Sequence, residues 1–143
     1  MSLESAYNTI EKLVEDFKAN EKHYLSSGYS ESQVRIDFID KFLIALGWDV
    51  NHDIQKNPYE QEVKVERGVD IGDARKRADY SFALAPNFRD TVFFVEAKKP
   101  SKNLLNPNDY FQAIRYGWNA ENPIVVLTDF EELHIIDSRS KPN

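Results

Sequence analysis

Cysteine is absent from the 143-residue chain, and this absence excludes several kinds of chemistry at once. Without a thiol there is no disulfide bond, no cysteine nucleophile and no zinc site built on cysteine. The three histidines, His23, His52 and His134, are far apart in the sequence and fall in different expected elements, so a histidine metal site is not indicated. Acidic and basic side chains remain as the main candidates for chemistry.

Long apolar runs and nucleotide-binding loops are also missing. Uninterrupted apolar runs such as 92–95 and 124–127 have four residues, whereas a membrane-spanning helix needs about 20. The N-terminus has no basic stretch followed by an apolar segment, so we expect no secretory signal and an intracellular, cytoplasmic protein outside the membrane. No Walker-type or G-x-G-x-x-G loop occurs, so any motor or methyltransferase would lie elsewhere.

Charge is unevenly distributed along this acidic chain. The whole sequence has 18 basic and 24 acidic residues, a net charge of −6, whereas the window 75–102 has a net charge of +4. A basic window in an acidic protein indicates one anionic ligand bound at one place. On charge alone, a solvated loop and strand end is the simpler interpretation.

Hydrophobic periodicity divides the chain into helices and strands. Two helix starts have specific signals: Ser30 and Gln33 form a potential capping box, and Asn106-Pro107 supplies an N-cap followed by proline at the first helical position. The periodicity predicts helices at 4–25, 30–46 and 106–119, and strands at 61–66, 77–84, 91–98, 124–128 and 133–136. This order predicts an α/β domain with a central mixed sheet, an antiparallel meander plus two C-terminal strands, flanked by helices.

Two neighbouring strands bring charged residues into this apolar sheet. On the strand 91–98, Glu96 and Lys98 share one face and Ala97 lies on the other. Asp79 stands near the start of the preceding strand and comes close to Glu96 if the two strands are neighbours. Buried charges are costly unless paired or bound to metal. The pattern therefore indicates either a salt-bridged lysine at a strand end or a divalent metal site of the kind that holds Mg²⁺.

These residues resemble a known family. Asp79 followed seventeen residues later by Glu96-Ala97-Lys98 resembles the D…(D/E)-x-K signature of the PD-(D/E)XK nucleases. E-x-x-V-R…L-G-W, from Glu31 to Trp48, is similar to the first helix of the nuclease domain in type I restriction subunits and fused, type IIG-like restriction–methylation enzymes. The segment 112–116 matches the Q-x-x-x-Y motif of the exonuclease-like branch. Ala78 stands where the name-giving proline would be, as is common in the family.

The resemblance covers about residues 29–138. It implies a restriction-endonuclease-like core over 29–143, preceded by an N-terminal helical extension over 1–28. It also implies a function: an endonuclease domain that hydrolyses phosphodiester bonds of double-stranded DNA in the presence of Mg²⁺, with Mn²⁺ as a substitute. Such a domain is the cleavage module of a restriction–modification enzyme, so we expect methyltransferase, helicase or specificity domains elsewhere in the full-length protein.

The resemblance assigns roles to individual residues. It implies that Asp79, Glu96 and the backbone carbonyl of Ala97 bind Mg²⁺, while Lys98 orients or deprotonates the attacking water and offsets charge on the phosphate. The resemblance also implies that Glu31 binds the metal through water or binds a second metal. A glutamate in a first helical turn also has a simpler explanation, a favourable interaction with the helix dipole.

Helix 106–119 and the basic window supply the remaining candidates. Gln112 and Tyr116 lie four residues apart on one helix face. The Q-x-x-x-Y resemblance implies that both belong to the catalytic site, where they position DNA or Lys98; the alternative is that they serve only in packing. In that packing interpretation the core is filled by their neighbours Tyr110, Phe111, Ile114 and Trp118. Predicted DNA contacts come from Arg75, Lys76, Arg77, Lys99 and Lys102, although the first three also fit a charged hairpin tip.

Two other functions stay open. One is a catalytically silent relative that serves as a DNA-binding or assembly module. The other is a nuclease of the same fold that acts in repair or as an exonuclease, which the Q-x-x-x-Y match favours. The complete set of Asp79, Glu96 and Lys98 argues against the silent module.

Overall fold

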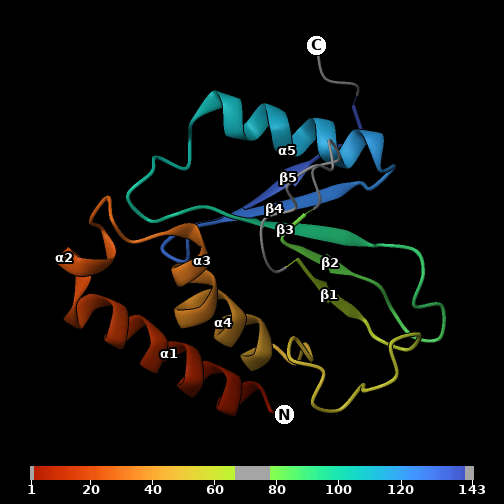
Figure 1. The fold of residues 1–143 in the computed structure, drawn as a ribbon, viewed down its shortest axis with the longest axis horizontal. Helices are drawn as coiled ribbons and strands as arrows, with labels where there is room; N and C mark the ends of the chain where they lie inside the picture. Colours follow the sequence, from red (N-terminus) through yellow and green to blue (C-terminus); the bar gives the residue numbers. More distant parts are fainter. Residues whose placement is uncertain (1, 67–77, 141–143) are drawn as a thin grey trace.

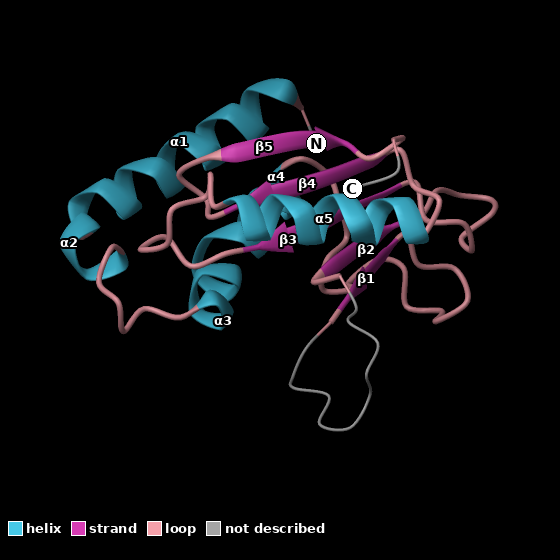
Figure 2. Cartoon of the chain, turned by 90° about the horizontal axis from the view of Figure 1, so that it is seen from above, coloured by secondary structure: helices cyan, strands magenta, loops and turns pink. Residues whose placement is uncertain are grey.

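The computed structural model describes residues 2–66 and 78–140 and forms three layers (Figure 1). The central layer is a five-stranded sheet in the order β1-β2-β3-β4-β5. Helix α5 covers one face, and α1, α3 and α4 cover the other (Figures 1 and 2). Arg75, Lys76 and Arg77, which were predicted to contact DNA, lie outside the described residues.

The sheet is mixed, as the sequence predicted. Strands β1 (Val63–Val65), β2 (Tyr80–Phe82) and β3 (Phe93–Ala97) form an antiparallel meander. Strand β4 (Ile124–Thr128) is parallel to β3, and β5 (Leu133–Asp137) is antiparallel to β4. The parallel pair requires a crossover, which α5 (Pro107–Asn119) provides. Because β3 and β4 run in the same direction, their C-terminal ends meet at one edge of the sheet.

The predicted helix over 4–25 is wrong at its C-terminal end. Helix α1 (Leu3–Ala19) stops at Asn20, where φ is −129° and ψ is 35°, and a short helix α2 (Glu21–Tyr24) follows. Asparagine has a lower helix propensity than the residues around it, which favours such an interruption, and its side chain does not cap α2. Leu13 and Phe17 of α1 enter the same hydrophobic cluster as the sheet residues Tyr80 and Phe82.

The predicted helix over 30–46 exists but is not regular. It comprises α3 (Glu31–Val34), a π-helical segment η1 (Arg35–Ile39) and α4 (Asp40–Ala45). The Ser30–Gln33 capping box is present at its start. Gly47, with φ of 105°, follows the last turn in a conformation that favours glycine. Segments of π-helix within α-helices are frequent at functional sites.

Helix α5 begins as predicted, with the Asn106 side chain accepting the backbone N–H of Asn108 and Pro107 at the first position. Its packing matches the expectation in part: Tyr110 and Ile114 pack against the core, whereas Phe111 and Trp118 are 46% and 38% exposed. The helix also approaches the sheet closely at Gly117, where a Cβ atom would collide with the side chains of Ser138 and Val125. Two of the four predicted core residues of α5 are therefore partly buried against the sheet, and the other two are exposed. None of the helices in the described residues is long and apolar enough to cross a membrane.

Candidate active site

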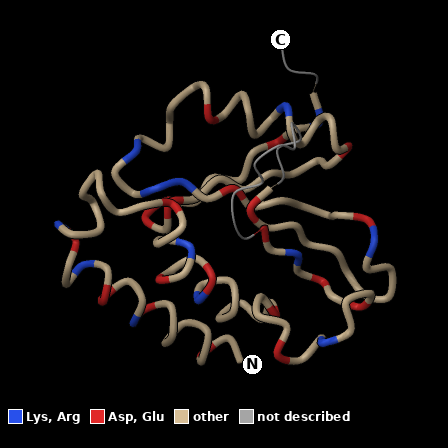
Figure 3. Tube along the Cα trace, in the orientation of Figure 1, with Lys and Arg blue, Asp and Glu red and all other residues tan. Residues whose placement is uncertain are grey.

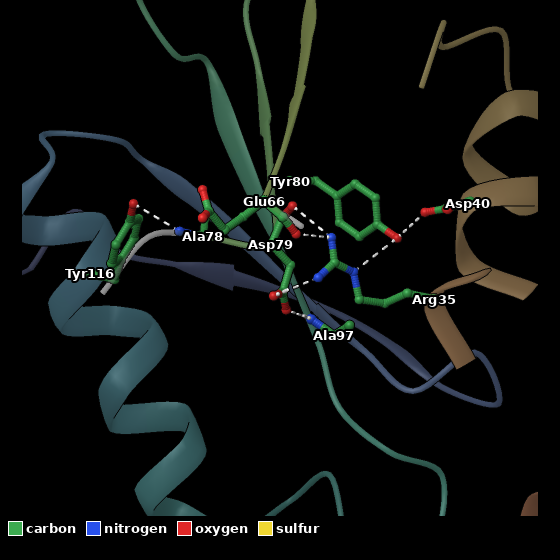
Figure 4. Close-up of polar contacts among 8 residues, drawn as sticks. All are labelled: Arg35, Asp40, Glu66, Ala78, Asp79, Tyr80, Ala97 and Tyr116. Atoms are coloured by element: carbon green, nitrogen blue, oxygen red, sulfur yellow. Dashed lines mark hydrogen bonds and ion pairs between the residues drawn. The ribbon is translucent and has the colours of Figure 1, made fainter. Parts of the chain in front are cut away.

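Asp79 connects the start of β2 to the end of β3. Its Oδ2 accepts a hydrogen bond from the backbone N–H of Ala97 at 2.8 Å, and its Oδ1 lies 3.3 Å from Nη1 of Arg35 (Figure 4). Antiparallel pairing of Tyr80 with Val95 explains why Asp79 arrives there, since the residue before Tyr80 then lies beside Glu96. The structure thus brings Asp79 to the Glu96-Ala97-Lys98 segment, as the spacing predicted.

Glu96 and Lys98 lie on the α5 side of the sheet, whereas Ala97 packs into the cluster on the other side. Glu96 is buried, with 5% of its surface exposed. Together with Gln112, Tyr116 and other residues of α5, they line a pocket of about 10 Å³, the space of one water molecule. The predicted alternation of faces is confirmed, and four of the predicted site residues share one pocket.

Lys98 is held by its backbone and by a carboxylate that the sequence analysis missed. Its N–H donates to the carbonyl of Thr128 at 2.9 Å, and its Nζ lies 3.7 Å from Oδ1 of Asp109. Asp109 is buried, with 6% exposed, and its Oδ2 also lies 3.1 Å from Nζ of Lys102. Asp109 is the third residue of α5, where an acidic side chain is readily explained by the helix dipole. Because the helix dipole accounts for an acid at this position, the sequence provided no reason to expect its contact with Lys98.

Glu31 lies beside Asp79 at the start of α3. Burial raises the pKa of the Glu31 carboxyl, and repulsion from the Asp79 carboxylate raises it further, while Lys98 and Arg35 act in the opposite direction. Four charged groups from three parts of the chain therefore meet at the C-terminal end of β3. Figure 3 shows acidic and basic residues close together where β3 ends and α3 begins. The prediction that places Glu31 near the carboxylates agrees with this geometry.

Arg35 is a second residue that the sequence analysis did not place in the site. It is the first residue of η1 and is buried, with 8% exposed. Its Nη2 donates to the carbonyls of Glu66 at 2.6 Å and of Asp79 at 3.2 Å. An arginine three and four residues before the buried Phe38 and Ile39 lies on the apolar face of its helix, and this spacing could have identified it.

The aromatic ring of Tyr80 supports Arg35. The guanidinium carbon lies 4.8 Å from the centre of the ring, in cation–π geometry, and Nε lies 3.5 Å from the hydroxyl. That hydroxyl donates a short hydrogen bond to the buried carboxylate of Asp40 (Figure 4). Burial, with the hydrogen bond to Asp40, raises the pKa of Tyr80. The two hydrogen bonds that link Asp40, Tyr80 and Arg35 hold the guanidinium on the side away from the Asp79 carboxylate.

Tyr116 contacts the backbone immediately before Asp79. Its hydroxyl accepts the N–H of Ala78 at 3.1 Å, and its ring packs edge-on against Phe94 with centroids 4.7 Å apart. Gln112, four residues earlier, is exposed at the rim of the pocket. Tyr116 therefore packs against β3 and holds the backbone at Ala78. A role of either residue in cleavage stays a prediction.

The two predicted DNA contacts among the described residues already have protein partners. Nζ of Lys99 donates to the carbonyl of Ser27 at 3.3 Å, and Lys102 pairs with Asp109. Both follow Lys98 closely in the sequence. Their contact with DNA stays a prediction.

The donor set suits a hard divalent cation. Asp79, Glu96 and the Ala97 carbonyl offer oxygen atoms only, which Mg²⁺ prefers. Within residues 2–66 and 78–140, however, no three acidic or histidine side chains surround one point as a metal cluster. Both oxygens of Asp79 have protein partners, so a cation at this carboxylate must share it with Arg35 or displace that side chain.

Comparison with known proteins gives one informative match. The chain is 37% identical over 131 residues, 90% of its length, to the type II restriction enzyme and methyltransferase RM.Eco57I of Escherichia coli. The match spans 13% of that enzyme's length. No protein-family model matches the chain, and no solved structure does. The chain is therefore a domain related to part of a restriction enzyme.

Proposed function

We propose that this restriction-enzyme-related domain is a metal-dependent DNA endonuclease, the cleavage module of a larger restriction–modification enzyme. The observation that carries the proposal is the contact of the Asp79 carboxylate with the backbone of Ala97, between Glu96 and Lys98. In this contact an acid that immediately precedes β2 lies beside the end of β3, which carries an acid and is followed by a lysine. The similarity to a restriction enzyme and methyltransferase supports DNA as the substrate and further domains as partners.

The fold proposed for this domain is that of the PD-(D/E)XK nucleases. The mixed sheet between helices and the position of Asp79, Glu96 and Lys98 at one end of neighbouring strands support it. The candidate metal ligands are Asp79, Glu96 and the Ala97 carbonyl. A bound Mg²⁺ supplies Lewis-acid stabilisation of the phosphate and lowers the pKa of an attacking water.

The other residues act around this centre. Lys98, held within 3.7 Å of Asp109, places an ammonium group on the same side as Glu96, where it orients water and offsets negative charge on the phosphate. Glu31 adds negative charge at Asp79 that favours a cation. Tyr116 fixes the backbone at Ala78 and thereby the orientation of the next residue, Asp79.

A catalytically silent DNA-binding or assembly module is the second candidate, and one observation favours it. Arg35 and the Ala97 N–H engage both oxygens of Asp79, as in a purely structural ion pair. The two functions differ in whether a divalent ion binds and whether a phosphodiester bond breaks.

Cleavage of closed-circular and linear plasmids by the full-length enzyme distinguishes the candidates. An endonuclease converts the circular form in Mg²⁺ or Mn²⁺, is inactive in excess EDTA, and binds Ca²⁺ without turnover. An exonuclease degrades only the linear form, because it needs ends. Retention of DNA binding without any cleavage or divalent-ion binding would establish the silent module, and cleavage that persists in EDTA would exclude the metal mechanism.

A further inference from the structure

Asp79 already has a cation, the guanidinium of Arg35. The ion pair is nearly enclosed, with 9% of the Arg35 side chain and 15% of the Asp79 side chain exposed. Its distance, 3.3 Å from Nη1 to Oδ1, is longer than the 2.6 Å from Nη2 to the carbonyl of Glu66. The contact with the carboxylate is therefore looser than the hydrogen bond that anchors the guanidinium to the Glu66 carbonyl.

The remaining contacts of Arg35 do not involve the Asp79 carboxylate. Backbone carbonyls of Glu66 and Asp79 accept from Nη2, and the ring and hydroxyl of Tyr80 contact the guanidinium. Asp40 fixes that hydroxyl. Arg35 is thus held in place even when the carboxylate has another partner.

Negative charge around Asp79 exceeds what Arg35 alone offsets. Glu31, one helical turn before Arg35, interacts repulsively with Asp79, and Glu96 is adjacent to the Ala97 N–H that binds Asp79. Lys98 is shared with Asp109. A doubly charged cation here would be attracted by the three carboxylates and repelled by the two cationic side chains, Arg35 and Lys98, of which Lys98 also faces Asp109.

We propose that Arg35 is the built-in counter-cation of Asp79, and that a divalent cation binds this carboxylate in competition with it. Arg35 is then a positioning residue: it holds the Asp79 carboxylate in the metal-free protein and lowers the affinity for the metal. The inference rests on the proposed function, because it concerns the same carboxylate.

Titration calorimetry of the chain with Mn²⁺ tests the competition directly. Arg35→Gln removes the charge and Arg35→Lys retains it, and both remove the forked hydrogen bonds to the two carbonyls. Lys41→Gln, exposed on α4, is a control with the same change in net charge. We expect Arg35→Gln to bind Mn²⁺ about tenfold more tightly than the parent. Arg35→Lys and Lys41→Gln should bind like the parent.

A purely structural Arg35 predicts a different pattern. Both Arg35 variants would then behave alike, with affinity unchanged or weakened, and that result would overturn the inference. NMR of the unsubstituted chain provides a measurement that does not depend on the variants' folding. The chain is titrated with Mg²⁺ in place of Mn²⁺, and the Arg35 Nε–Hε resonance should shift in proportion to the fraction of protein that has bound Mg²⁺. A resonance that has not shifted when the protein is saturated with Mg²⁺ would contradict competition.

The outcomes separate this inference from the proposed function. If the parent binds the ion and the full-length enzyme cleaves DNA, but Arg35→Gln leaves the affinity unchanged, only the competition is wrong. If neither the parent nor Arg35→Gln binds a divalent ion, the metal site itself is absent and both proposals fail.

Discussion

The Asp79 carboxylate lies 2.8 Å from the backbone nitrogen of Ala97, although the two residues are 18 positions apart in the chain. This contact joins the first residue before β2 to the last residue of β3 and places Asp79 beside both neighbours of Ala97. A carboxylate that served only solubility would face water and would not accept a hydrogen bond from the backbone N–H of a buried residue at the end of a strand. The contact therefore defines the candidate site more sharply than the sequence motif does.

Replacing Asp79 tests its pairing with Arg35. From the sequence alone, removal of one of two neighbouring carboxylates is expected to preserve or raise stability, because their repulsion is relieved. The structure reverses this expectation for Asp79→Ala, because a buried guanidinium loses its anionic partner. We expect the free energy of unfolding to fall by about 1–3 kcal/mol in urea denaturation. Asp53→Ala, at an exposed position, is the control, and a stability equal to that of the parent would show that the pair contributes nothing.

Glu31→Gln should stabilise the metal-free chain in a pH-dependent manner. Burial and Asp79 raise the pKa of Glu31 above its ordinary value of 4.5, so the folded chain binds this proton more tightly than the unfolded chain does. The contribution of Glu31 to the stability of the parent therefore falls as pH rises from about 4.5 through the raised pKa. The gain from Glu31→Gln should be small below pH 4.5 and grow toward neutrality.

The measurement is the free energy of unfolding of both proteins between pH 4 and 8. Glu11→Gln, on the exposed face of α1, removes the same charge far from Asp79. A gain that does not vary with pH, or that matches the Glu11→Gln control, would contradict the local repulsion.

Tyr116→Phe removes the hydroxyl that accepts the Ala78 N–H and keeps the aromatic ring. We expect a loss of about 1 kcal/mol in the free energy of unfolding and a moderate reduction in cleavage by the enzyme, because the backbone before Asp79 is less well held. Tyr7→Phe, with its ring exposed on α1, should change neither quantity. Unchanged stability and cleavage in Tyr116→Phe would restrict Tyr116 to packing.

Gly117→Ala tests the close approach of α5 to the sheet. The added methyl group meets the side chains of Ser138 and Val125, so the helix must shift outward. We expect destabilisation of about 1–3 kcal/mol, seen as a lower melting temperature. Gly28→Ala is the matched control, because no atom lies within 4 Å of its Cβ position. Equal melting temperatures for the two variants would show that α5 is less tightly packed than the structure indicates.

Local signals in the sequence predicted the parts of the fold that depend on neighbouring residues. The cap at Ser30, the Asn106-Pro107 start of α5 and the boundaries of β4 all follow from short-range chemistry, and each is confirmed. Period-two alternation also predicted that Glu96 and Lys98 face away from Ala97. These features need no knowledge of what the strands pack against.

Long-range features were not predictable in the same way. The ion pair between Arg35 and Asp79 joins residues 44 positions apart, and helical periodicity cannot distinguish an α-helix from the π-helical segment that begins at Arg35. Asp109 had a sufficient local explanation as a first-turn acid, so nothing in the sequence pointed to Lys98 as its partner. Only the fold brings these groups together.

The most direct test of the account is the cleavage of supercoiled plasmid by the full-length enzyme carrying Glu96→Gln. The substitution preserves the size of a side chain with 5% of its surface exposed and removes the charge that the proposed metal site requires. With Glu60→Gln, at an exposed position, as the control, the account predicts a folded Glu96→Gln enzyme that leaves the plasmid intact in Mg²⁺. Cleavage by Glu96→Gln at the rate of the parent would contradict the assignment of this site.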